Sequence, residues 1–180
     1  MFETLLGNAP IAAAIRQMLD ENRLPQTLLF AGPEGVGKAT LARLVAAAIN
    51  CRNRDTDFSA TPCGACPACS RILEADLSLP DYRKLFEERL RLSADKRRDS
   101  PLVISTHPDF LTFPPDGPLA QISIEQVRTL KEYAQFAPAQ GRGRLFLVDH
   151  ADRIDFAAAN SLLKVLEEPP QRSLFRRAQF

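Results

Sequence analysis

Hydrophobic residues in the first fifty positions follow two different spacings, which predict a helix, a strand and a second helix. The first helix is expected to begin after a cap at Asn8, and its apolar residues recur at helical spacing, at Ile11, Ile15, Met18 and Leu19. The apolar run 27–31 stops at a glycine, as a buried strand does when it enters a tight loop. The next helix is expected to begin near Lys38, with apolar positions on one face, at Leu41, Leu44, Val45, Ala48 and Ile49.

The second half of the chain continues the alternation of strands and helices. Residues 110–113 form a candidate strand between prolines, and Ser123 to Gln126 has the form of a capping box that starts a helix. Residues 145–148 are an unbroken apolar run, which is typical of a central parallel strand. A last helix, from about 156 to 168, is stopped by two prolines. This order predicts an α/β fold in which helices flank a parallel sheet.

Two regions depart from this alternation. Residues 51–69 show little periodicity, and the charged segment from 71 to about 99 is expected to be a helical excursion. Its apolar stripe is expected at Tyr82, Leu85, Phe86 and Leu90. The basic cluster 96–98 is interpreted as a solvated surface. Residues 171–180 do not have the pattern of the strand expected there.

Composition narrows the class without indicating a partner. The chain has 180 residues, 45% of them hydrophobic, and 23 Lys and Arg against 22 Asp and Glu give a net charge of +1. These values exclude disordered, collagen-like and coiled-coil chains, and a nucleic acid or membrane would have to bind a local patch. Because Met1 is not followed by a basic and then an apolar segment, and no apolar stretch is long enough to span a bilayer, we expect one cytoplasmic domain with additions.

Residues 32–38 fit the phosphate-binding pattern G-x-x-x-x-G-K between a predicted strand and a predicted helix. The backbone amides and the positive end of the helix neutralise phosphate oxygens, and the lysine reaches toward the β and γ positions. This context disfavours the alternative of an ordinary glycine-rich turn. The predicted nucleotide-binding residues are Gly32, Pro33, Glu34, Gly35, Val36, Gly37, Lys38, Ala39, Thr40 and Asp149.

Two positions differ from an ATP-hydrolysing site. Ala39 stands where a Ser or Thr hydroxyl normally ligates magnesium, and Thr40 is turned away by roughly 100° on a helix. Asp149 resembles the magnesium-holding Asp after a buried strand, although a strand-ending Asp is the alternative. The next residue is His150, where an active site would carry a water-orienting Glu. We therefore expect nucleotide binding with little hydrolysis and no catalytic residues.

Four cysteines fall in one short window, which in a reducing compartment indicates a metal rather than disulfides. Four thiolates are enough for a closed tetrahedral zinc site with a structural role, at Cys51, Cys63, Cys66 and Cys69. Free thiols and an iron–sulfur cluster are the alternatives. His107 is not needed as a ligand and is interpreted as a loop or capping residue.

The chain resembles the clamp-loader branch of the AAA+ family, and within it the delta prime type of DNA polymerase III subunit. The resemblance covers roughly residues 1–72 and 106–170. The residues that carry it are Phe2, Leu5 to Asn8, Arg23 to Pro25, the loop 32–38, the four cysteines, His107 to Asp109 and the run 158–170.

The resemblance implies an AAA+ domain over residues 1–170 that contains a zinc module at 51–69 and a helical insertion at 73–102, followed by an atypical or truncated end at 171–180. It implies a mainly structural subunit that works with gamma or tau and delta subunits to load the sliding clamp onto primed DNA. The ATP-hydrolysing gamma and tau types carry Thr and Glu where this chain has Ala39 and His150. The alternatives are an active gamma/tau-type ATPase and a P-loop kinase, which leaves the cysteines and the run 158–170 unexplained.

Overall fold

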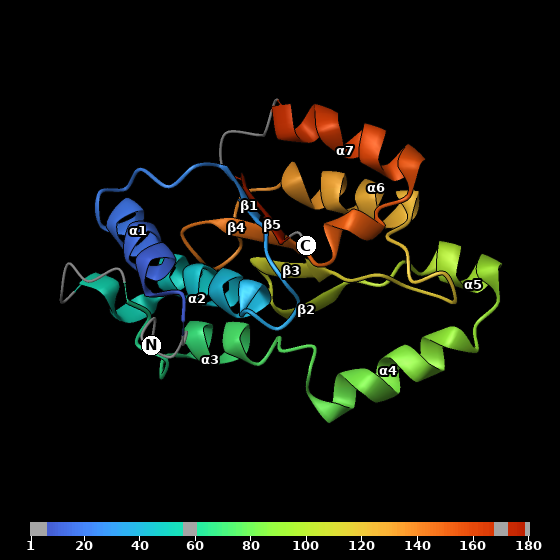
Figure 1. Ribbon diagram of the computed structural model, residues 1–180, viewed down its shortest axis with the longest axis horizontal. Coiled ribbons are helices and arrows are strands. Elements are labelled where there is room, and N and C mark those ends of the chain that lie inside the picture. The colour runs from blue at the N-terminus through green and yellow to red at the C-terminus, as the bar shows by residue number, and fades with distance from the viewer. Residues whose placement is uncertain (1–6, 56–60, 168–172, 179–180) are drawn as a thin grey trace.

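A five-stranded sheet with the order β1-β5-β4-β3-β2 lies at the centre of the part of the chain described by this computed structural model, residues 7–55, 61–167 and 173–178 (Figure 1). β2 is antiparallel to β3, and the other neighbouring strands are parallel. The strands are β1 (Thr27–Phe30), β2 (Ile104–His107), β3 (Phe110–Phe113), β4 (Arg144–Val148) and β5 (Ser173–Ala178).

Seven helices and two short 3-10 segments connect these strands within the described residues. The helices are α1 (Ala9–Asp20), α2 (Lys38–Asn50), α3 (Pro67–Leu73), α4 (Pro80–Leu90), α5 (Ala94–Asp99), α6 (Ile124–Ala134) and α7 (Phe156–Glu167), and the 3-10 segments are η2 (Arg52–Asp55) and η3 (Ala151–Arg153). Figure 1 shows α1, α2 and α3 on one face of the sheet and α6 and α7 on the other. The predicted α/β fold with a parallel sheet flanked by helices is confirmed.

Side chains of β3 and β4 alternate between two hydrophobic cores, because successive strand residues point to opposite faces. Phe110, Leu145 and Leu147 belong to the core with α1, α2 and α3. On the other face, Leu111 and Phe146 belong to the core with α6 and α7. Each such side chain contributes about 1.5–3 kcal/mol on burial, so the two cores fix α2 and α7 against the sheet.

Helix α2 is buried along almost its whole length, because the sheet, α1 and α3 surround it. Two polar residues are buried within it, Arg43 at 6% exposure and Asn50 at 3%. A buried polar side chain is costly without partners, and each of these two has several. Asn50 Oδ1 accepts hydrogen bonds from the backbone amides of Arg142 (3.0 Å) and Gly143 (3.3 Å), which ties the C-terminal end of α2 to the loop before β4.

Most predicted elements are present, with two local corrections at the start of α1 and at the end of the chain. The capping box at Ser123 and Gln126 is confirmed by both of its hydrogen bonds. Asn8 is the N-cap residue of α1, as expected, but its side chain makes no capping bond and instead donates to Val36 O at 2.9 Å. The expectation that residues 171–180 contain no strand is wrong, because β5 pairs with β1 and β4 on both sides. Pairing with two neighbours, rather than the local hydrophobic pattern, defines this strand.

The charged excursion is helical, as predicted, and consists of α4 and α5, which lie beside the sheet away from α1 (Figure 1). The predicted apolar stripe is wrong at Leu90, which is 52% exposed, whereas the neighbouring Arg89 is buried. Arg89 forms an ion pair with Asp116 and donates to Ser100 O at 2.8 Å. A buried charge pair therefore anchors α4 where the hydrophobic pattern predicted an apolar contact.

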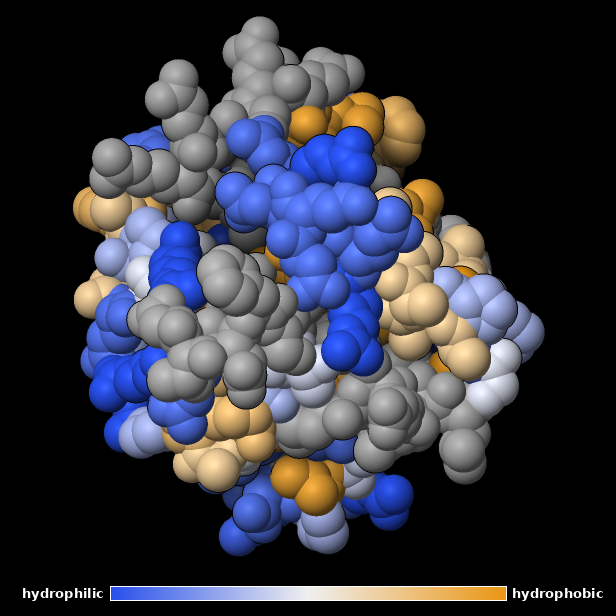
Figure 2. Space-filling model, turned by 90° about the vertical axis from the view of Figure 1, so that its left-hand side faces the viewer, coloured by the Kyte–Doolittle hydropathy of each residue, from blue (hydrophilic) through white to orange (hydrophobic). Residues whose placement is uncertain are grey.

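None of the described helices is both long and apolar enough to cross a bilayer. On the face shown in Figure 2, hydrophilic residues form a continuous central area, and hydrophobic residues lie in separate groups near the margin.

Candidate functional site

The loop between β1 and α2 has the backbone of a phosphate-binding loop. Gly35 and Gly37 have φ angles of +82° and +90°, in the left-handed region that favours glycine. Gly37 is the N-cap of α2, so the first backbone amides of that helix face the loop. Lys38 Nζ donates to the carbonyl oxygens of Gly32 and Pro33, both at 2.8 Å, which holds its ammonium group over the loop.

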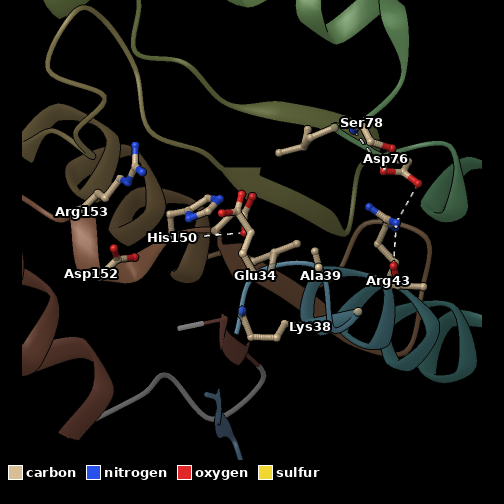
Figure 3. Close-up of a pocket in the computed structure, with 15 residues that line it drawn as sticks. Glu34, Lys38, Ala39, Arg43, Asp76, Ser78, His150, Asp152 and Arg153 are labelled. Atoms are coloured by element: carbon tan, nitrogen blue, oxygen red, sulfur yellow. Dashed lines mark hydrogen bonds and ion pairs between the residues drawn. The ribbon is translucent and has the colours of Figure 1, made fainter. Parts of the chain in front are cut away.

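A pocket of about 500 Å³ brings this loop together with the end of β4 (Figure 3). The carboxyl ends of parallel strands meet at one edge of a sheet, where α/β proteins bind their ligands. Of the predicted residues, the pocket is lined by Glu34, Gly35, Gly37, Lys38, Ala39, Thr40 and Asp149. Gly32, Pro33 and Val36 are not part of the lining. Their carbonyl oxygens instead accept hydrogen bonds that shape the loop.

Both positions that differ from a hydrolysing site lie in this pocket. Ala39 presents a methyl group, and Thr40 Oγ1 accepts a hydrogen bond from Arg43 Nη2 at 3.3 Å. His150 has φ +52°, and its backbone amide donates to Asp149 Oδ1 at 3.1 Å. The pocket therefore contains the groups that hold phosphate, but no hydroxyl directly after the lysine and no carboxylate directly after Asp149.

Arg43 and Asp76 are among the pocket residues that were not predicted from the sequence. Arg43 has a side chain that is 7% exposed, forms an ion pair with Asp76 at 2.9 Å and donates to Ala75 O at 3.3 Å. Burial opposes ionisation of Asp76, but hydrogen bonds from Ser78 and the Arg43 charge hold its pKa below the usual value. Figure 3 shows Arg43 directed toward Asp76. The spacing of three residues between Thr40 and Arg43 on a helix was a usable signal for the contact between them.

The four cysteines come together at the other end of α2. Their sulfur atoms all lie within 4.8 Å of one another, and Cys63 Sγ is 4.0 Å from Cys69 Sγ. Four sulfurs around a zinc ion at about 2.3 Å would be separated by about 3.8 Å. All four are free thiols, and Cys51, Cys66 and Cys69 are buried, whereas Cys63 is exposed. The donor set and its spacing therefore fit a metal ion.

Backbone amides directed at two of the sulfurs favour their thiolate forms. Cys66 N donates to Cys63 Sγ at 3.3 Å and lowers the pKa of Cys63. Burial raises the pKa of Cys66, but the amides of Cys69 and Arg52, with the neighbouring thiols, bring that pKa down to about 6. Burial raises the pKa of Cys69, the sulfur that donates to Ala47 O at 3.6 Å. A bound cation would favour the thiolate at Cys69 as well.

His107 lies outside the cysteine cluster, and its interpretation as a loop or capping residue is wrong, because it is the last residue of β2 and pairs with Phe110. Its Nδ1 accepts a hydrogen bond from Asp109 N at 3.1 Å. The Asp109 carboxylate is buried and accepts from the amides of Ala139 (2.6 Å), Gln140 (2.7 Å) and Gly141 (2.7 Å). It also pairs with Arg144 at 3.3 Å. His107 and Asp109 therefore order the turn between β2 and β3 and the loop before β4.

A strand, a glycine-rich loop and a helix, together with a parallel strand that is followed by Asp149, are the features expected of the AAA+ clamp-loader class. Residues 7–175 match the family described as DNA polymerase III, delta subunit. The chain belongs to this family.

Similar proteins agree with this assignment. The chain is 29% identical to DNA polymerase III subunit tau of Escherichia coli over 97% of its own length and 22% of that protein. It is 30% identical to subunit gamma/tau of Mycobacterium tuberculosis over 97% of its own length and 24% of that protein. The chain thus spans about a quarter of the length of these curated relatives. A DNA polymerase III gamma subunit-related protein of Thermotoga maritima has a solved structure with 30% identity and a TM-score of 0.37, covering 40% of this chain and 24% of that one.

Proposed function

We propose that this chain is a delta prime-type subunit of the DNA polymerase III clamp loader, which helps load the sliding clamp onto primed DNA with little or no ATP hydrolysis of its own. Its partners would be gamma or tau and delta subunits in the cytoplasm, and it would contact the clamp and primed DNA through the complex. The observation that carries this proposal is a phosphate-binding pocket with Ala39 and His150 in the two positions where a hydrolysing subunit has side chains that act on the transition state.

The pocket supports binding of ATP or ADP. Backbone amides at the start of α2 and the Lys38 ammonium provide most of the affinity for phosphate, and neither depends on the side chain at position 39. Without a hydroxyl at that position a magnesium ion would lose one ligand, and without a carboxylate at position 150 the attacking water would lose its orienting group. Losses of this kind cost orders of magnitude in rate, so binding would persist while hydrolysis would be absent or very slow.

Zinc at the four cysteines is the second part of the proposal. Zinc supplies a closed set of bonds to four thiolates and leaves no position for a reacting water, so its role would be structural. The cysteines come from the end of α2, the following loop and the start of α3, and the metal would hold these segments together. Adding zinc to the metal-free chain should restore its full stability, whereas magnesium, which prefers oxygen ligands, should not.

An active gamma/tau-type ATPase is the second candidate, because the relatives named above carry those names at 29–30% identity. The two candidates differ in one measurement, ATP hydrolysis in the complete loader. We expect the wild-type chain to contribute none and the double variant Ala39→Thr, His150→Glu to raise the rate. His150→Gln with Ala39→Thr is the matched control, because it keeps the size of the new side chain without its charge.

Two results decide between the candidates. A rate increase that requires Glu rather than Gln at position 150 supports the proposal. The pocket would then bind ATP and lack only the hydroxyl at position 39 and the carboxylate at position 150. If the wild-type chain already hydrolyses ATP as fast as the double variant, and Lys38→Ala abolishes that activity, the proposal is wrong and the active-ATPase alternative replaces it.

A further inference from the structure

A second cavity, of about 330 Å³, lies where the four-cysteine segment meets the sheet. It shares no lining residue with the nucleotide pocket. Four short segments contribute its walls: η2, α3, the end of β2 and the 139–141 loop. The lining residues are Arg52, Pro67, Ala68, Arg71, His107 and Gln140.

His107 supplies a buried hydrogen-bond donor to this cavity. The residue is only 2% exposed, and its Nδ1 already accepts from Asp109 N. In the neutral ring the proton is therefore on Nε2. Among the described residues, no group accepts a hydrogen bond from Nε2. The hydrogen bond from Asp109 N to Nδ1 orients the ring, and the Asp109 carboxylate is itself fixed by three backbone amides.

The charged groups of the cavity are all positive. Within the described part of the chain, neither Arg52 nor Arg71 has a carboxylate partner, and no acidic residue is among those that line the cavity. Burial lowers the pKa of His107, Asp109 raises it, and the charges of Arg71 and Arg52 lower it further, so both guanidinium groups act on the ring. The cavity therefore combines two unpaired cations with a buried neutral donor.

Backbone contacts fix the main chain of both arginines, which are exposed residues. The Arg52 amide donates to Cys66 Sγ, and the Arg71 carbonyl in α3 accepts from Thr106 Oγ1 of β2 at 2.5 Å. Arginine presents a planar set of donors that matches the oxygens of a phosphate group. We propose that this cavity is a second anion site, which binds a phosphate group through Arg52, Arg71 and His107 Nε2. The phosphate comes either from a free anion or from a nucleic-acid strand.

The test follows the His107 imidazole by long-range ¹H–¹⁵N NMR while inorganic phosphate is added to the purified chain. The chain has two histidines, so the signals are assigned by comparison with a His150→Gln variant. A Lys38→Ala background removes phosphate binding at the loop, which keeps this test separate from the proposed nucleotide site. We expect phosphate to shift the Nε2 signal, and we expect Arg52→Gln with Arg71→Gln to weaken binding at least tenfold, because charged hydrogen bonds are lost.

Arg98→Gln is the matched control, because Arg98 is an exposed arginine of α5 that pairs with Asp95 and does not line the cavity. Arg71→Gln alone, with unchanged far-UV circular dichroism and metal content, provides a second variant in case the double variant does not fold. The proposal is overturned if phosphate leaves His107 unmoved throughout the titration, or if the arginine variants bind phosphate as tightly as the Arg98→Gln control.

Single-stranded oligonucleotides with and without a 5′-phosphate identify the source of the phosphate. A His107 shift with both oligonucleotides supports a backbone phosphodiester as the ligand, and a shift with the phosphorylated one alone supports a terminal phosphate. A shift with inorganic phosphate but with neither oligonucleotide supports a free anion.

Discussion

The two ends of α2 carry two candidate sites that differ in how much each depends on side chains. At the N-terminal end, backbone amides, Gly37 and one lysine form the phosphate-binding loop beside an open pocket. At the C-terminal end, four cysteine side chains must converge within 4.8 Å of one another. A backbone site can lose side chains at positions 39 and 150 and still bind a ligand, whereas a four-thiolate site cannot lose a ligand and stay closed.

The polar contacts around the two ends of α2 differ as well. Near the cysteine end, Asn50 and Asp109 together accept hydrogen bonds from five consecutive backbone amides, residues 139–143. Near the loop end, the comparable polar anchor is Arg43, which contacts Thr40, Ala75 and Asp76. We therefore expect substitutions at the cysteine end to act on stability and those at the loop end to act on nucleotide binding.

The largest effect is expected from Cys69→Ser. It removes a fully buried ligand, and we expect the zinc content to fall from one per chain to none and the free energy of unfolding to fall by roughly 4 kcal/mol or more. Elemental analysis and thermal unfolding measure both quantities. Ser70→Ala, the next residue of α3, is the control and should keep its metal. A Cys69→Ser chain with full zinc content would contradict the four-ligand site.

Asp109→Asn is expected to cost roughly 3 kcal/mol of unfolding free energy, because it leaves the buried Arg144 without a charge partner. Burial opposes ionisation of Asp109, but the three amides and Arg144 hold its folded pKa below the usual value. The unfolded chain therefore binds this proton first as the pH falls. The stabilisation is complete above about pH 4, the unfolded pKa, and is lost as the pH falls through the folded pKa.

Chemical unfolding between neutral and acidic pH checks this dependence. The difference in stability between wild type and Asp109→Asn should shrink as the solution is acidified. A difference that stays constant down to the acid unfolding limit would show that the charge of Asp109 does not contribute.

Two glycine substitutions compare the two ends of α2 directly. A Cβ at Gly141 would overlap the Asn50 side chain, because Asn50 Cγ would lie 2.6 Å away. Gly141→Ala should therefore lower the free energy of unfolding by about 2 kcal/mol, because the buried Asn50 amide group must move. A Cβ at Gly35 would meet nothing within 4 Å, but the φ of +82° is strained for alanine. Gly35→Ala should therefore lower the free energy of unfolding by about 1 kcal/mol. Denaturant unfolding gives both values, and nucleotide titration should detect a defect only for Gly35→Ala. Equal losses of stability in Gly141→Ala and Gly35→Ala would contradict the expectation that the cysteine end of α2 matters more for stability than the loop end.

The sequence predicts the parts of this molecule that depend on local spacing. The periodic helices, the strands at 27–30, 110–113 and 144–148 and the convergence of the loop with Asp149 follow from hydrophobic pattern and from motif spacing. β5 and the burial of Arg89 do not, because a strand between two partners and a charge paired with Asp116 are defined by contacts distant in sequence. The cavity that His107 lines arises in the same way, from four segments with no common motif.

The smallest effect is expected for Arg43→Lys, which tests the polar anchor at the loop end of α2. Arg43 joins Thr40 to Asp76, both of which line the same pocket, and lysine cannot reproduce its branched set of donors. Because Asp76 is 36% exposed, solvent screens the pair, and we expect a loss of less than about 1 kcal/mol in unfolding free energy.

Arg98→Lys is the control, since Arg98 and Asp95 are 61% and 80% exposed and their pair should contribute less than about 0.5 kcal/mol. Nucleotide titration of Arg43→Lys should also show weaker binding, because Thr40 loses the donor that orients its hydroxyl. If Arg43→Lys changes neither stability nor binding more than Arg98→Lys does, Arg43 does not act as the polar anchor of the loop end.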